Sequence, residues 1–267
     1  MDPMVVHGVD FSGAADAGRR IWISSRVVHD GSLRITRTRP ASELLGGSVV
    51  RATALRALRS FIQSASGAIG LDFPFGLPRM VMSRPTWTEF ILGFSSRYSS
   101  AGAFRGECRQ VSVRELRRTT DADAHAPWAA WNWRLYRQTY FGITELIAPL
   151  VRDGRVRVLP MQEADYGSPL LLEICPASTL RRLGLTGLSY KGGADADRRT
   201  ARKAIISRLA RATRVAIDPI ARHRAIEDPG GDALDSLVAA VAVHRAIANE
   251  RIQPAGAIHQ IEGFIYF

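Results

Sequence analysis

Cysteine, lysine and long apolar runs are all scarce in this chain of 267 residues. The two cysteines, Cys108 and Cys175, form no CxxC pair, which argues against a disulfide framework and a cysteine-rich zinc site. No apolar run reaches the ~18–20 residues that span a bilayer, and Met1 to Asp10 lacks the basic and apolar regions of a signal peptide. We therefore expect a cytoplasmic protein with no membrane partner.

Several common motifs are missing as well. The chain contains no GxxxxGK[ST], GxSxG or HExxH sequence, so P-loop nucleotidase, serine hydrolase and zincin functions have no support. No repeat is visible that would predict a solenoid or propeller. A hydrophobic content of 46% with 23% charged residues is instead typical of an ordinary globular protein, which excludes a disordered or collagen-like chain.

Positive charge is abundant, and nearly all of it is arginine. Lysine and arginine number 36 against 25 acidic residues, so the formal net charge is +11, yet only Lys191 and Lys203 are lysines. Arginine makes forked contacts with phosphate, which favours an anionic partner such as nucleic acid. Alternatively, codon bias replaces lysine by arginine; this explains the ratio of the two residues well and the net charge less well.

Strand and helix patterns alternate in an order typical of an α/β protein. Three β-type segments predict an antiparallel meander, and a helical pattern from Val50 to Ile62 precedes a fourth. A helix at this point provides a crossover, so the fourth strand is expected to pair parallel to the first. The five predicted strands are Met4–Val9, Ile21–Val28, Leu33–Thr38, Ala68–Phe73 and Leu170–Cys175.

Residues from about 79 to 160 lack this regularity and are interpreted as an insertion with some helix of its own. A short strand is expected at Val156–Leu159, inside the insertion. Helical segments follow the fifth strand, the last from Asp232 to about Asn249, and the tail Ile261–Phe267 either adds a strand or packs on the body. We expect a single domain over 1–267, with a mixed five-stranded sheet flanked by helices and the insertion between strands 4 and 5.

Four aspartates occupy positions at which carboxylates meet in such a fold. Asp10 ends the first strand and Asp72 lies near the end of the fourth, so parallel pairing places both at one edge of the sheet. Asp232 and Asp235 open the last helix, and a spacing of three residues, ~300° of rotation, puts them on one face. If this helix crosses the same edge, the four carboxylates converge.

Clustered carboxylates repel one another unless cations hold them. All-oxygen ligands suit Mg²⁺ or Mn²⁺, and a pair of such ions ~3.5–4 Å apart activates water and stabilises the leaving oxygen of a phosphodiester. The competing interpretation is local: Asp10 and Asp72 shape turns, while Asp232 and Asp235 cap a helix and complement its dipole.

The motifs around these residues resemble a bacterial and archaeal family of unknown function, number 429 of its series, which is described as predicted nucleases with a ribonuclease H-like fold. The last helix is also similar to the final helix of Holliday-junction resolvases. The resemblance implies a strand order of 3-2-1-4-5 and metal ligation by Asp10, Asp72, Asp232 and Asp235. The motifs are Gly8-Val-Asp10-Phe-Ser-Gly13, Leu71-Asp-Phe-Pro74, Glu173-Ile-Cys-Pro176, Tyr190-Lys191, Gly231-Asp-Ala-Leu-Asp235-Ser and Glu262-Gly263.

Other residues are candidates for contact with substrate. Glu173 lies in an apolar strand, so it either joins the acidic site or pairs with an arginine of the insertion. Lys191 precedes two glycines, where it either approaches a phosphate or sits in a surface turn. Trp133 lies in an aromatic and basic segment, Trp128–Tyr140, that is expected to be helical and either stacks bases or packs the insertion. Arg114, Arg117 and Arg118 form a basic run that is either a solvated face or a phosphate track.

These observations favour a Mg²⁺- or Mn²⁺-dependent nuclease that hydrolyses phosphodiester bonds with two metal ions. The first alternative is an actin-like or sugar-kinase-like phosphotransferase, because Asp10-Phe-Ser-Gly13 resembles a phosphate loop after a first strand. That alternative normally needs a second domain and a second nucleotide loop, neither of which is evident. The second alternative is a catalytically silent nucleic-acid-binding module, which has no need of metal.

Overall fold

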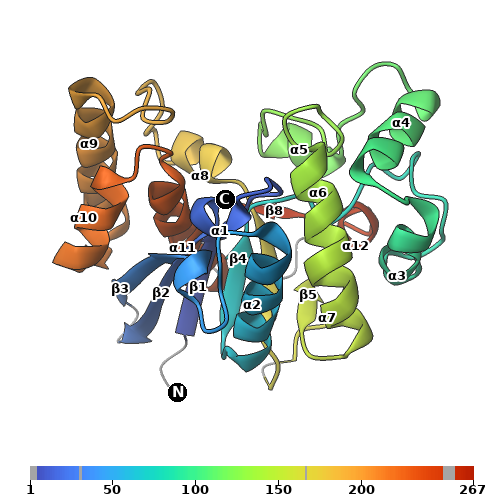
Figure 1. Ribbon diagram of the computed structural model, residues 1–267, viewed down its shortest axis with the longest axis horizontal. Helices are drawn as coiled ribbons and strands as arrows, with labels where there is room; N and C mark the ends of the chain where they lie inside the picture. The colour runs from blue at the N-terminus through green and yellow to red at the C-terminus, as the bar shows by residue number, and fades with distance from the viewer. Residues whose placement is uncertain (1–4, 30–31, 166, 249–255) are drawn as a thin grey trace.

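The central strand of the sheet is β1 (Val5–Asp10), which lies between β2 (Trp22–His29) and β4 (Ala68–Leu71). It pairs antiparallel with β2 and parallel with β4, and β3 (Ser32–Pro40) completes the meander (Figure 1). The expected crossover between the third and fourth strands is therefore present. This computed structural model describes residues 5–29, 32–165, 167–248 and 256–267.

Among the residues that the structure describes, the sheet has eight strands, in the order β5-β6-β4-β1-β2-β3-β7, with β8 paired to β6. The five expected strands keep the relative order 3-2-1-4-5, the fifth being β6 (Leu170–Ile174), but a sheet of only five strands was wrong. The short strand expected in the insertion is β5 (Arg157–Leu159), and the tail supplies β8 (Ile265–Tyr266). The strand missed altogether is β7 (Ala216–Ile217), because two residues are too few for an alternating pattern.

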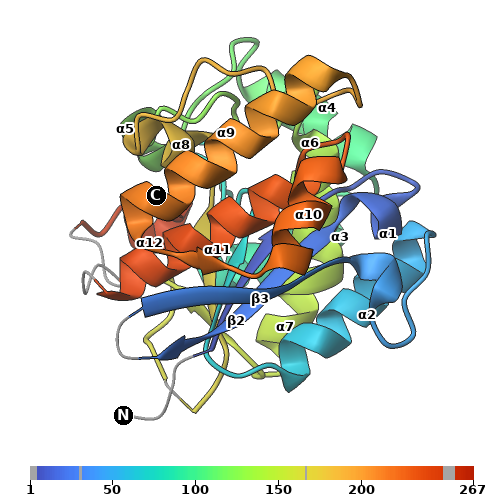
Figure 2. The same cartoon turned by 90° about the vertical axis from the view of Figure 1, so that its left-hand side faces the viewer.

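Alternate residues of the strands face two separate cores, one on each side of the sheet. Val9, Leu71 and Leu171 pack with one set of helices, whereas Val6, Leu170 and Leu172 pack with the other. On the second side lie α9 (Ala196–Thr213), α10 (Pro219–Glu227) and α11 (Asp232–Ala248), as Figure 2 shows. On the first side lie α2 (Arg51–Ser64) and the insertion.

Helix α11 packs unusually close to β1 because Gly8 has no side chain. A Cβ atom at Gly8 would lie 2.1 Å from the backbone N of Ala240, so only glycine allows this approach. The buried hydroxyls of Ser236 and Ser24 are 2.7 Å apart and connect the same helix to β2. This packing brings the first turn of α11 to the end of β1. The expected boundaries at Met4 and Asn249 lie outside the described residues.

The insertion forms a helical layer whose helices pack around an aromatic cluster. The rings of Phe94, Tyr98 and Phe104 pack within 5.3 Å of one another, with Tyr140 beside them. The helix expected over Trp128–Tyr140 begins only at Tyr136, so the tryptophans precede it in a loop. The helical elements of the insertion are α3 (Trp87–Arg97), α4 (Ala101–Val111), α5 (Thr119–Asp123), α6 (Tyr136–Gly142), the π-helix Ile143–Ile147 and α7 (Ala148–Arg152).

The other helical elements of the described residues are short. They are α1 (Ala17–Arg20), the 3₁₀ turn Ala41–Glu43, α8 (Pro176–Arg182) and α12 (His259–Glu262). In the part of the chain that the structure describes, every helix is too short or too polar to cross a bilayer.

Candidate active site

A cavity of about 350 Å³ opens at the carboxyl ends of β1, β4 and β6. The structure brings all four predicted aspartates, Asp10, Asp72, Asp232 and Asp235, to its wall. They come from three elements far apart in the sequence, and the edge of the sheet at which they meet is the one at which ligands bind in α/β folds.

The two strand aspartates are held by the sheet itself. Asp10 is the last residue of β1 and is only 6% exposed. Asp72 directly follows β4, and its backbone N–H donates to the carbonyl of Val9 at 3.1 Å. Parallel pairing of Val9 with Leu71 thus places the two side chains together, with their carboxyl groups within hydrogen-bonding reach.

The helix aspartates are free to face the cavity because another residue caps α11. The carboxylate of Asp228 accepts hydrogen bonds from the N–H groups of Ala233 at 2.8 Å and Gly230 at 3.3 Å. Gly231, at a φ of +79°, turns the chain into the helix, a conformation that favours glycine. The expected alternative, in which Asp232 serves as the cap, is therefore not the arrangement observed.

Asp235 is engaged by two neighbouring residues on the loop before α9. The ammonium of Lys191 forms an ion pair with Oδ2 of Asp235, and the hydroxyl of Tyr190 donates to Oδ1 at 2.7 Å. This loop is fixed by the buried Arg202, which donates from Nη1 to the carbonyl of Tyr190 at 2.8 Å and from Nε to the carbonyl of Ile226 at 2.7 Å. Lys191 therefore enters the acidic cavity from a well-supported position.

The carboxylates of the cavity carry more negative charge than Lys191 balances. Burial, followed by the charge of Asp235, raises the pKa of Asp10 well above its ordinary value. The same two causes raise the pKa of Asp72 to about 7. Burial and the charge of Asp228 raise the pKa of Asp232 to about 6. Groups whose ionised forms are disfavoured in this way are stabilised by an additional cation.

The donor atoms are chemically suited to a divalent cation, since all are carboxylate oxygens. Asp10, Asp72 and Asp232 are the side chains that would hold it. Both oxygens of Asp235 already contact Tyr190 and Lys191, so this carboxylate has part of its negative charge satisfied by the protein. In the structure as it stands, no group of three or more histidine, cysteine or acidic side chains among the described residues, these aspartates included, is close enough together to hold a metal ion.

Glu173 adopts the second of its two expected roles. Its carboxylate forms an ion pair with Arg118 of the insertion, whose Nη1 donates to Oε2 at 2.8 Å, and it accepts from the N–H of Phe75 at 2.9 Å. Arg118 also pairs with Asp121 at 2.7 Å and is 1% exposed. The expectation that Arg118 contacts phosphate at the surface was wrong. Its guanidinium is buried and forms ion pairs with two buried carboxylates, which would repel each other in its absence.

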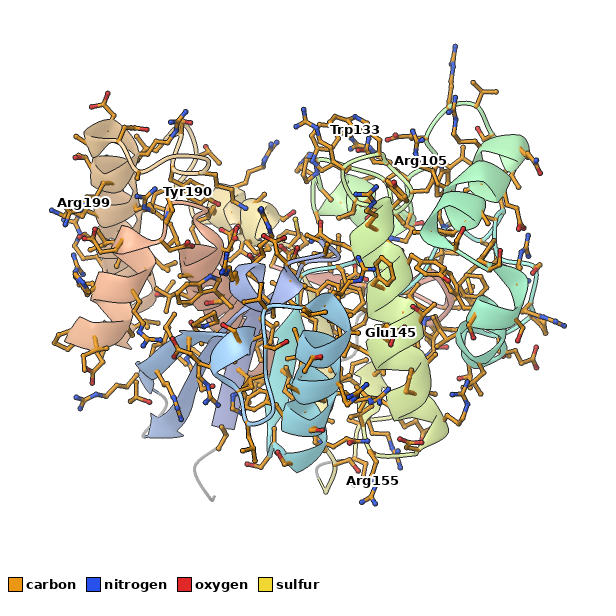
Figure 3. The ribbon with its side chains drawn as sticks, in the orientation of Figure 1. Arg105, Trp133, Glu145, Arg155, Tyr190 and Arg199 are labelled. Atoms are coloured by element: carbon orange, nitrogen blue, oxygen red, sulfur yellow. The ribbon has the colours of Figure 1, made fainter. Side chains whose placement is uncertain are left out.

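The other predicted substrate contacts lie outside the cavity wall. Arg114 and Arg117 are exposed in the loop between α4 and α5, and Trp133 is 61% exposed between α5 and α6. Figure 3 shows Trp133 and Tyr190 at the same end of the molecule, on its right and left sides. Lys191 is the predicted substrate contact that both lines the cavity and is half exposed.

Sequence reasoning attached no role to Tyr190 or Arg20, both of which line the cavity. Tyr190 stood only in a noted motif, whereas Arg134, also in the cavity wall, belongs to the aromatic and basic segment already singled out. Glu262 was also noted only as a motif. Its two carboxylate oxygens accept from the N–H groups of Arg79 at 2.7 Å and Thr119 at 2.9 Å, which ties the insertion to the tail.

The protein belongs to the α/β class: it has one mixed sheet between layers of helices, with an acidic cavity at the carboxyl ends of the parallel strands. Its sequence matches the family described as "Protein of unknown function (DUF429)" over residues 8–257, and the chain belongs to that family. No curated protein matches the chain, and no solved structure does.

Proposed function

We propose that this protein is a metal-dependent nuclease on a ribonuclease H-like scaffold. The observation that carries the proposal is the meeting of Asp10, Asp72, Asp232 and Asp235 in one cavity. Residues that only shape turns or cap helices have no reason to converge from two strands and a helix. The raised pKa values of Asp10, Asp72 and Asp232 support the proposal, because a further cation would stabilise their ionised forms.

The chain's own residues have distinct tasks in this function. Asp10, Asp72 and Asp232 would hold Mg²⁺ or Mn²⁺, and Asp235 would lie beside them in the same cavity. Divalent ions bound at such a site lower the pKa of water and stabilise the leaving oxygen of a phosphodiester. Lys191, half exposed at the rim, then contacts the phosphate, and Tyr190 keeps Asp235 oriented.

The charge of the protein supports an anionic polymer as the substrate. The formal net charge is +11, although the site itself is acidic, so the positive charge lies elsewhere. Arg20 and Arg134 line the cavity, and Arg117 and Arg137 are exposed nearby in the sequence of the insertion. Basic residues around an acidic centre attract phosphates and leave the carboxylates to bind metal.

One observation favours a second candidate function, a nucleic-acid-binding module without catalysis. Both oxygens of Asp235 have partners from the protein, so the site is partly satisfied without metal. A protein that never binds metal would keep this arrangement permanently.

Cleavage assays with end-labelled oligonucleotides distinguish the two candidates. Single- and double-stranded DNA and RNA are incubated with Mg²⁺, with Mn²⁺ or with a chelator. We expect cleavage of at least one substrate with metal, its loss in Asp10→Asn, and its retention in Asp197→Asn, an exposed aspartate on α9. Binding without cleavage of any substrate under either metal would establish the silent module instead.

A further inference from the structure

Two tryptophans are exposed beside the acidic cavity and share one arginine. Trp128 is 38% exposed and Trp133 is 61% exposed. The guanidinium carbon of Arg134 lies 4.8 Å from the ring centre of Trp128 and 4.9 Å from that of Trp133. We call these three residues the Trp–Arg patch. Its aromatic area is open to solvent, although aromatic side chains ordinarily bury most of their surface.

The Trp–Arg patch lies on a loop that is held in place by buried side chains. Asn132 is 5% exposed, its Nδ2 donates to Glu115 at 2.7 Å, and its Oδ1 accepts from the N–H of Arg134 at 2.8 Å. Trp131 of the same loop is 1% exposed and fastens it to the core. The loop therefore already has an aromatic anchor, and the two exposed rings are not needed for its packing.

The patch adjoins the carboxylates. Trp128 and Arg134 line the same cavity as Asp10, Asp72 and Lys191. In Figure 3, Trp133 stands at the upper end of the molecule, on the opposite side from Tyr190. A ligand whose phosphate reaches the aspartates consequently has its adjoining groups beside the aromatic rings.

We propose that the Trp–Arg patch stacks unpaired nucleobases, so that the substrate is single-stranded at the nucleotides next to the reacting phosphate. This inference rests on the proposed function and narrows its substrate class. Every base has a π-face, so stacking on tryptophan or arginine is independent of sequence. In a duplex those faces are covered by neighbouring pairs, and only base edges and backbone are accessible. Arg134 adds positive charge for the backbone at the same place.

The test is a binding measurement without turnover. Fluorescence anisotropy in chelator compares an end-labelled 12-mer of deoxythymidine, an abasic 12-mer with the same phosphates, and a 12-base-pair duplex. We expect the wild type to bind the thymidine strand about tenfold more tightly than the abasic strand. In the double variant Trp128→Ala/Trp133→Ala this preference disappears, while the salt dependence stays, because the arginines remain.

Two controls separate stacking from a change in folding. Trp128→Phe/Trp133→Phe restores most of the preference, because phenylalanine also stacks. Ile220→Ala, which alters a side chain 70% exposed on α10, leaves the preference unchanged. Equal binding of thymidine and abasic strands by the wild type overturns the inference, as does a preference that survives in the alanine variant. If the alanine variant instead changes the oligomeric state in sedimentation and keeps the preference, the patch is a protein contact and the inference is wrong.

The design keeps this inference apart from the proposed function. Asp10→Asn is expected to retain the preference for thymidine, since it lies outside the patch. A preference without any metal-dependent cleavage supports stacking and refutes the nuclease. Cleavage with equal affinity for abasic strands supports the nuclease and refutes stacking.

Discussion

The ammonium of Lys191 lies against the carboxylate of Asp235, in a cavity that is also lined by Asp10, Asp72 and Asp232. The charges of Asp10 and Asp72 act on the same ammonium. Lys191 thus supplies from the protein part of the positive charge that the acidic site requires. If the site binds a divalent cation as proposed, we expect that cation to compete with Lys191 for Asp235.

Replacement of Lys191 by methionine is therefore expected to lower the stability of the metal-free protein and to raise its affinity for metal. Without metal, the loss of a cation among buried carboxylates lowers the free energy of unfolding by about 1–3 kcal/mol. With metal, Asp235 is free, so Mn²⁺ binds more tightly in Lys191→Met, as isothermal titration calorimetry measures. Lys203→Met, at the exposed second lysine on α9, is the matched control. An unchanged dissociation constant in Lys191→Met would show that the two cations do not compete.

Metal is expected to raise the melting temperature of the wild type. A ligand that binds only the folded state adds about 2.7 kcal/mol at a hundredfold excess over its dissociation constant. Asp10→Asn removes a buried ligand and abolishes this increase, whereas Asp197→Asn preserves it. Differential scanning fluorimetry over a range of Mn²⁺ concentrations checks the prediction. A melting temperature of the wild type that stays constant up to millimolar Mg²⁺ and Mn²⁺ contradicts it.

The stability of the metal-free protein should fall as pH rises through the range in which the Asp72 carboxyl group loses its proton. Burial and the charge of Asp235 raise its pKa from 3.8 to about 7 in the folded state, so the folded state binds a proton that the unfolded chain has lost. The stabilising effect of this proton is present at pH 4 and is lost as pH rises through about 7.

Asp72→Asn removes this dependence, because asparagine does not ionise. Above pH 7 and without metal, we expect the variant to be about 2 kcal/mol more stable than the wild type, after allowance for partial solvent exposure. Urea unfolding at pH 4, 6 and 8 measures the difference. A difference between the two proteins that is the same at all three pH values would rule out a raised pKa at Asp72.

Arg118 and Arg114 are four residues apart, yet their replacement should have very different consequences. Arg118→Met leaves Asp121 and Glu173 buried without their shared cation, which costs about 3–5 kcal/mol. Arg114→Ala alters an exposed loop residue and changes stability by less than about 0.5 kcal/mol. Chemical denaturation of both variants gives the comparison. A cost below about 1 kcal/mol for Arg118→Met would mean that this ion-pair network contributes little to folding.

The parallel pairing of β1 with β4 and the meeting of the four aspartates were predictable from local patterns, whereas the relative order of the strands was implied by the family resemblance. Asp10 and Asp72 end apolar strands, and the helix between the third and fourth strands fixes their parallel direction. The spacing of Asp232 and Asp235 likewise requires only the period of a helix.

Which particular residues pair with Glu173 and Asp235 was not predictable, because the partners are distant in sequence. Glu173 pairs with Arg118 at a separation of 55 residues, and Tyr190 reaches Asp235 at 45. No local pattern distinguishes Arg118, which is buried, from Arg117, which is exposed. In the aromatic segment the helical spacing was misleading, since Trp131 anchors a loop and the helix starts at Tyr136.

The contacts of Glu262 have a consequence for protein synthesis. Glu262 follows Arg79 by 183 residues and Thr119 by 143 residues in the sequence. Both residues are therefore translated well before the carboxylate that accepts hydrogen bonds from their N–H groups. Helix α11, with Asp232 and Asp235, is translated only shortly before Glu262. A nascent chain therefore contains the residues of its Trp–Arg patch about 100 residues before Asp232 and Asp235, and the wall of the cavity is complete only after Ile265 has been translated.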